Sequence, residues 1–183
     1  HINFSERAES DALDAEWLSR STVQLHWHNH AWCDFDDFLC SLKSKKRKNI
    51  RQERTKTKDA GYCFRTLVGN AISDEDLQIM HGFYQRTFEE YGNAPALTLP
   101  FFQLLREILP QNLVLVMASR NGLTCAGALF LRSTDTLYGR YWGSSESSPG
   151  LHFETCYYQG IEYCIREGLT CFEPGAQGEH KVA

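Results

Sequence analysis

The chain has 183 residues, of which 19 are Lys or Arg and 23 are Asp or Glu, so its formal net charge is −4. Hydrophobic residues make up 42% and aromatic residues 13%, a composition that excludes a disordered chain and is typical of a globular protein with a core. No apolar run approaches the roughly 20 residues of a membrane span, and no signal-peptide pattern opens the sequence. We therefore expect a cytoplasmic protein of one domain, or of one domain and a piece of another.

The first predicted elements surround a basic segment. Alternation of apolar and polar residues predicts a strand over 23–28. Asp34 is suited to be the N-cap of one long helix, which begins with an apolar stripe and runs through the basic segment to about residue 60. A strand is predicted over 62–68 after Gly61, and Ser73 with Asp76 opens a helix over 74–92.

The later elements predict the fold class. A short apolar helix over 101–109 is followed by two apolar runs around Asn121-Gly122, which predict a β-hairpin. A strand over 136–142, a helix over 151–168 and a strand over 169–173 then form a β-α-β crossover. This order predicts an α/β (α+β) fold with a mixed, mainly antiparallel central sheet and helices on both faces.

Cysteines and histidines are the candidate metal ligands. None of the seven cysteines belongs to a C-x-x-C pair, so we expect reduced, mostly buried thiols without a disulfide framework. His26, His28 and His30 alternate along the first predicted strand near Cys33, and they could present ligands from one face. Because histidines are also common on the polar side of an edge strand, we expect no metal here.

Positive charge is concentrated in residues 43–58. Nine of these residues are Lys or Arg and only Glu53 is acidic, while the rest of the chain has a net charge of −12. This localisation predicts one anion-binding surface, with Lys46, Arg47 and Arg51 as candidate contacts to phosphate groups. Two alternatives stay open: a solvated helix that binds nothing, and a nuclear localisation signal in the KKRK string.

Two stretches resemble a known family. The order of elements is that of the GNAT-type acyltransferase fold, and LKSKKRKNIRQERTKTKDAG (42–61) resembles the basic helix of FemAB-type aminoacyltransferases. The segment from LYGRYWG to GEHK (137–181) resembles a bacterial FemAB-like family that is linked by name to peptidoglycan biosynthesis or recognition. The resemblance implies that residues 1–33 are the tail of a first GNAT-like half and residues 34–183 most of a second.

The same resemblance implies an N-acyltransferase or aminoacyltransferase. An acyl or aminoacyl group would move to an amine from acyl-CoA or an aminoacyl-tRNA, with a phosphate-bearing small molecule, tRNA or peptidoglycan precursor docked on the basic helix. The alternative is a non-catalytic recognition module of the same fold that binds peptidoglycan precursors or RNA. Against CoA, the loop GSSESSPGLHFE (143–154) lacks the Gly-x-Gly spacing of CoA-binding loops and carries Glu146 and Glu154.

One candidate group of ligand contacts lies on the strand LYGRYWG. Its alternation places Tyr138, Arg140 and Trp142 on one face. An Arg between two aromatic residues suits a planar group that lies beside an anion. The alternative is that Arg140 pairs with a carboxylate of the neighbouring strand, such as Glu173.

A second candidate group lies where the last helix begins and the last strand ends, since ligands of open α/β sheets gather outside the strand ends. Acyl transfer to an amine needs a base, for which His180, Glu179 and Glu154 are candidates, and donors for the oxyanion, such as the GAQG backbone. Each acid could instead be a helix cap or a surface charge. The candidate residues of this group are His152, Glu154, Gln177, Glu179 and His180.

Overall fold

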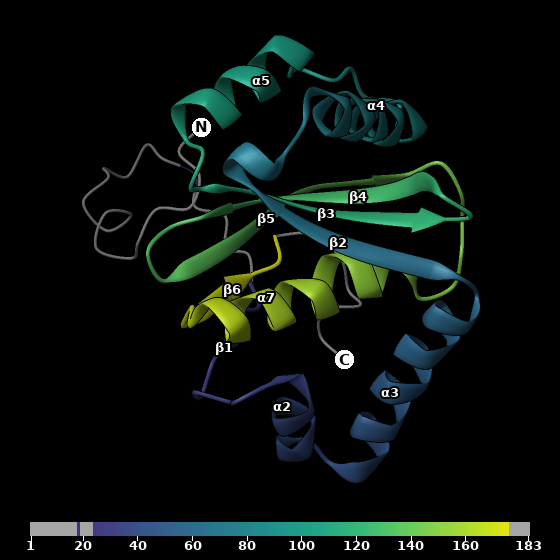
Figure 1. Ribbon diagram of the computed structural model, residues 1–183, viewed down its shortest axis with the longest axis vertical. Helices are drawn as coiled ribbons and strands as arrows, with labels where there is room; N and C mark the ends of the chain where they lie inside the picture. The colour runs from purple at the N-terminus through teal and green to yellow at the C-terminus, as the bar shows by residue number, and fades with distance from the viewer. Residues whose placement is uncertain (1–17, 19–23, 176–183) are drawn as a thin grey trace.

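A six-stranded sheet forms the centre of the computed structural model, which describes residue 18 and residues 24–175 (Figure 1). The strand order is β1-β6-β5-β4-β3-β2, and every neighbouring pair is antiparallel except β5 and β6. The predicted mixed, mainly antiparallel sheet is thereby confirmed. The strands are β1 (Trp27–His28), β2 (Tyr62–Val68), β3 (Leu113–Arg120), β4 (Leu123–Arg132), β5 (Thr136–Ser144) and β6 (Cys171–Glu173).

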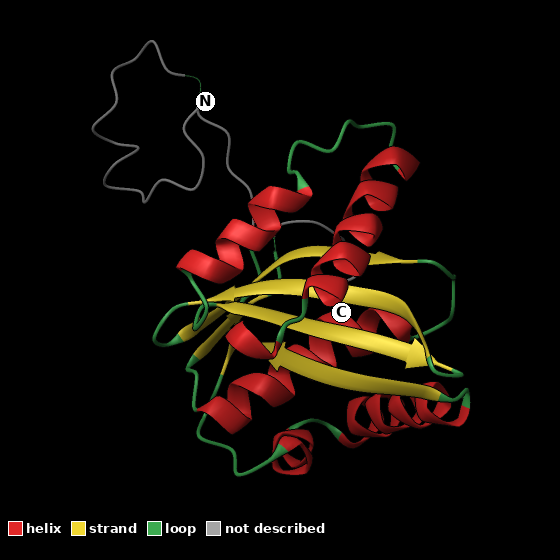
Figure 2. Cartoon of the chain, turned by 45° about the horizontal axis from the view of Figure 1, so that its top comes forward, coloured by secondary structure: helices red, strands yellow, loops and turns green. Residues whose placement is uncertain are grey.

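Helices cover both faces of the sheet, as predicted (Figures 1 and 2). One face carries α4 (Asp74–Glu90) and α5 (Leu99–Ile108), which pack on a cluster that includes Leu77, Met80 and Phe102. The helices of the other face are α2 (Phe35–Ser41), α3 (Ser44–Asp59), and a helix in three parts: α6 (Leu151–Phe153), the π-helical turn η2 (Glu154–Tyr158) and α7 (Gln159–Glu167). A 3₁₀ turn, η1 (Gly69–Ala71), follows β2.

Local sequence signals explain several elements. Asn121 and Gly122 both have positive φ, 53° and 79°, and make the two-residue turn predicted between β3 and β4. Ser73 caps α4, because its Oγ accepts from the backbone N of Asp76 at 3.1 Å while the Asp76 carboxylate accepts from the backbone N of Ser73 at 3.0 Å. Both predictions are confirmed.

The prediction of one long helix from residue 34 to residue 60 is wrong. The chain is extended at Leu42 and Lys43, with ψ of 154° and 143°, so α2 ends and α3 begins there. The Ser41 hydroxyl donates to the carbonyl of Phe38 at 2.6 Å, a local bond that competes with continuation of the helix. As a result α3 leaves α2 in a new direction, as Figure 1 shows.

Candidate functional site

Helix α3 is attached to the molecule through Arg54. The Arg54 Nε lies 3.1 Å from both carboxylate oxygens of Glu154, and its Nη2 donates to Glu154 at 2.9 Å and to Glu162 at 2.7 Å. Its guanidinium also lies 4.3 Å from the centre of the Phe35 ring. Burial acts to lower the pKa of Arg54, but the charges and hydrogen bonds of Glu154 and Glu162 outweigh burial and raise it.

Glu154, a candidate base, belongs to this junction. Its side chain is buried, and Gln159 Nε2 donates to it at 2.8 Å in addition to Arg54. All of these donors are protein side chains, and through them the carboxylate holds α3 in place. The junction also includes the Tyr158 hydroxyl, which donates to the Glu53 carboxylate.

The solvent-facing side of α3 bears a groove, which we call the basic groove. Within it Arg51 Nη2 pairs with Asp36 at 2.9 Å, and Arg47 Nη1 donates to the carbonyl of Cys40 at 3.3 Å. In the described part of the chain, Lys48 and Lys56 are exposed and have no ion pair. Lys46 is exposed outside this groove. The basic groove is lined by Ser44, Arg47, Lys48, Arg51, Gln52, Thr55 and Lys56.

A β-bulge changes the predicted arrangement on β5. Tyr141 pairs with Leu129 and Gly139 with Phe130, so Arg140 is the extra residue of the bulge. Trp142 therefore packs in the cluster of the α7 side, whereas Tyr138 pairs with Leu131, which packs in the cluster of the α4 side. The prediction that Tyr138, Arg140 and Trp142 share one face is wrong.

Arg140 makes the pairing that was the alternative to a ligand contact. Its Nη1 lies 3.7 Å from Glu173 Oε1, and its guanidinium lies 5.2 Å from the centre of the Tyr138 ring. Gln24 Nε2 donates to the same Glu173 oxygen at 2.7 Å. Arg140 thus links β5 to β6 beyond the last pairing of these strands, Tyr138 with Glu173.

Aromatic side chains gather where α6 begins. The rings of Trp142 and His152 lie 5.1 Å apart, and His152 lies 5.7 Å from Tyr157, which stacks on Phe153 at 5.3 Å. Burial, with a smaller effect of the neighbouring Cys156, raises the pKa of Tyr157 to about 12. Two predicted ligand contacts, Trp142 and His152, are therefore brought together in a mainly apolar setting.

In the loop before α6, the charge of Glu146 is balanced by groups that sequence reasoning missed. Glu146 accepts from the Tyr62 hydroxyl at 2.5 Å and pairs with Arg120. The hydrogen bond from Tyr62 is the main cause of the lowered pKa of Glu146. Gly150 adopts φ of 82° at the start of α6, where an added Cβ would lie 3.2 Å from the Thr57 hydroxyl. The start of α6 therefore faces α3 at close range.

Three predicted residues, Gln177, Glu179 and His180, lie outside the described residues, so the candidate cleft is described only on its β5 and α6 sides. The residues that sequence reasoning missed are mainly partners in ion pairs. Arg54 had a detectable signal, because it follows the buried Ile50 by four residues and precedes the buried Thr57 by three. Arg120 had no such signal in the sequence, since its partner Glu146 lies in a loop.

A family model described as peptidoglycan biosynthesis/recognition, the FemAB_like family, matches residues 1–183. The fold described above is thus that of a FemAB-like protein. This chain belongs to that family. No protein with curated annotation matches it significantly in sequence.

Solved structures with a similar fold include FemX, with a TM-score of 0.62 and 13% identity over 87% of this chain and 55% of FemX. L-PGS from Bacillus licheniformis has a TM-score of 0.54 and 15% identity, over 79% of this chain and 47% of the L-PGS chain. A third structure is the C-terminal domain of a protein from Agrobacterium fabrum that is assigned as a lysylphosphatidylglycerol synthetase. Its TM-score is 0.55 and its identity 13%, over 75% of this chain and 44% of its own. The chain spans about half the length of these structures, and the likeness shows the fold. Among the described helices, none has the length and apolarity that a membrane crossing requires.

Proposed function

We propose that this protein is a cytoplasmic FemAB-like transferase that moves an acyl or aminoacyl group to an amine acceptor. The phosphate-bearing donor or acceptor docks in the basic groove, and a peptidoglycan precursor is the expected acceptor. Membership of a family described by peptidoglycan biosynthesis supports the class of reaction. The likeness in fold to a domain of a lysylphosphatidylglycerol synthetase also supports it.

The basic groove is the observation that carries this proposal. Lys48 and Lys56 are cations without a described ion pair, and they lie on a helix whose opposite side is held by Arg54. A helix fixed in this way holds the backbone of these two lysines in place before a ligand binds, which favours binding of a phosphate group. The acidic remainder of the chain repels a polyanion and so restricts docking to this surface.

The chemical step is assigned to the crevice between β5 and the turn after β6. His180 or Glu179 is the proposed base for the acceptor ammonium, and the GAQG backbone supplies donors to the oxyanion. Trp142 and His152 form the aromatic wall of this crevice. In this proposal residues 1–33 are the tail of a first GNAT-like half; the β1 strand of this tail pairs with β6, and the first half completes the site. Positioning of the two substrates then supplies much of the rate.

Binding experiments with matched charge variants test the proposal. Acetyl-CoA, a total aminoacyl-tRNA pool and a UDP-linked muropeptide are titrated against the chain at several salt concentrations. For a tRNA ligand, Lys48→Glu/Lys56→Glu should weaken binding by at least about tenfold and should reduce the salt slope of log K by about two. The control Lys43→Glu/Lys58→Glu changes the same charge at the two ends of the same helix, outside the basic groove, and its effect should stay below about threefold.

Equal losses in the two double variants would show that the ligand responds to total charge and would contradict docking in the basic groove. Saturable binding of acetyl-CoA alone would identify an ordinary acetyltransferase. Absence of binding for all three probes would favour the solvated helix.

A recognition module is the second candidate, and the engagement of Glu154 by Arg54 and Gln159 favours it. Turnover separates the two candidates. Transfer of a radiolabelled aminoacyl group that is lost in His180→Gln supports the enzyme, provided that the variant still binds its ligand. Binding without turnover in the unmodified chain supports the module.

A further inference from the structure

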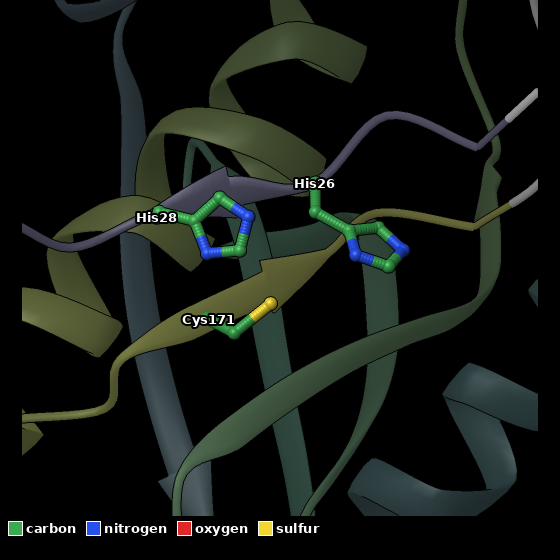
Figure 3. A group of neighbouring side chains, drawn as sticks. All are labelled: His26, His28 and Cys171. Carbon is green, nitrogen blue, oxygen red and sulfur yellow. The ribbon is translucent and has the colours of Figure 1, made fainter.

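His26, His28 and Cys171 gather on one side of the sheet edge (Figure 3). His28 pairs directly with Cys171 across β1 and β6, and the adjacent pair, Trp27 and Phe172, lies in the cluster that packs against α7. Because side chains alternate along a strand, the core-facing pair directs the histidines and the cysteine to the opposite side. Their ligand atoms all lie within 4.8 Å of one another.

We propose that His26, His28 and Cys171 bind a zinc ion. Imidazole nitrogen and cysteine thiolate are the ligands that zinc prefers in proteins, at about 2.0–2.1 Å and 2.3 Å. A tetrahedral site with these bond lengths needs ligand atoms about 3.3–3.7 Å apart. Both histidine side chains are exposed, so they are free to rotate toward this spacing when the ion binds.

Glu173 supplies the second layer of this site. It follows Cys171 by two residues on the same face of β6, and its Oε2 lies 4.0 Å from His26 Nε2. Its other oxygen is held by Gln24 at 2.7 Å and faces Arg140 at 3.7 Å, so the carboxylate is oriented toward the histidine. A carboxylate that accepts from the far nitrogen of a zinc-bound histidine is a common second-layer contact, and His26 would then bind zinc through Nδ1.

The ligand set differs from the one that sequence spacing suggested. His30 lies against the ring of Trp32 at 5.1 Å, and the backbone N of Cys33 donates to Asp37, so neither belongs to the group. Three protein ligands leave one zinc position open to water or to an added ligand, as in catalytic rather than structural zinc sites. The proposal is independent of the basic groove.

Titration with cobalt(II), a spectroscopic substitute for zinc, tests this site in the reduced full chain. One equivalent should produce a thiolate-to-cobalt charge-transfer band, and zinc should displace it. The band should be lost in Cys171→Ser, and the affinity should fall at least about tenfold in His28→Asn. The matched controls are Cys63→Ser and His30→Asn, which remove an exposed cysteine and a histidine that both lie outside the group. Both controls should keep the band and the affinity.

Retention of the band in Cys171→Ser, or its loss in Cys63→Ser, would overturn the proposal. Thermal unfolding with and without zinc provides a second readout. Zinc should raise the melting temperature of the unmodified chain and of His30→Asn, but not that of His26→Asn/His28→Asn. An equal rise in all three proteins would also overturn the site. Should Cys171→Ser fail to fold, the histidine variants decide the question.

Discussion

Arg51 and Arg54 lie three residues apart on α3, and each pairs with a carboxylate, yet their surroundings differ. The Arg51 and Asp36 side chains are 51% and 76% exposed, whereas those of Arg54 and Glu154 are 26% and 4% exposed. Water screens the first pair, and removal of one partner leaves the other in contact with water. Removal of Arg54 would leave the Glu154 charge buried, with Gln159 as its remaining donor among the residues that the structure describes.

We therefore expect Arg54→Met to lower the free energy of unfolding by about 2–4 kcal/mol, because a buried charge loses its partner. Arg51→Met should change it by less than about 0.5 kcal/mol. Urea denaturation of both variants measures the difference. Adding Glu154→Gln to Arg54→Met should restore part of the loss, and equal losses in the two single variants would contradict this account.

At the scale of elements, α4 lies unusually close to the sheet. A Cβ added to Gly143 on β5 would lie 2.3 Å from the backbone carbonyl oxygen of Phe83. Thr87 Oγ1 also donates to the carbonyl of Trp142 at 2.9 Å, so helix and strand are in direct contact. The absence of a side chain at Gly143 is what permits this contact.

Gly143→Ala should consequently lower the free energy of unfolding by about 3 kcal/mol, because α4 must move away from β5 and its packing is lost. The control is Gly82→Ala, at an exposed position of α4 with nothing within 4 Å of the added Cβ. This control should raise stability by up to about 1 kcal/mol through helix propensity. A neutral result for Gly143→Ala in thermal or urea unfolding would contradict the close packing.

Elements determined by neighbouring residues were predictable from sequence. The turn at Asn121-Gly122 and the Ser73 cap depend on interactions within a few residues, and both were found where predicted. The break at Leu42 and the bulge at Arg140 were not predicted, because periodicity continues across them in the sequence. The Ser41 bond at the end of α2 and the extra residue on β5 leave no mark on that periodicity.

The candidate site, too, could be predicted only in part from the sequence. The basic segment was evident from composition, but only the structure separates Arg54, which holds the helix, from Lys48 and Lys56, which line the basic groove. The group around His28 includes Cys171 because β1 pairs with β6. No spacing rule along the chain connects these residues, since strand order at a sheet edge is a property of topology.

For the whole molecule, the distribution of charge predicts the orientation of a bound polyanion. Excess positive charge lies on α3, while α5 lies across the sheet, on its other face (Figure 1). Hydrogen exchange with the tRNA pool should therefore slow for amides of residues 44–59 and remain unchanged for residues 99–108. High salt should remove the protection. Protection of residues 99–108 alone would place the ligand on the wrong face and contradict the basic groove.

The contact between Gln24 and Glu173 has a consequence for how the fold is connected. Gln24 lies three residues before β1 and Glu173 is the last residue of β6, and their side chains share a 2.7 Å hydrogen bond. The segment before β1 and the end of β6 therefore lie next to each other, an arrangement that tolerates circular permutation. A permuted chain opened between Asn121 and Gly122 and joined by a short linker near residues 24 and 175 would retain all five strand pairings of the sheet.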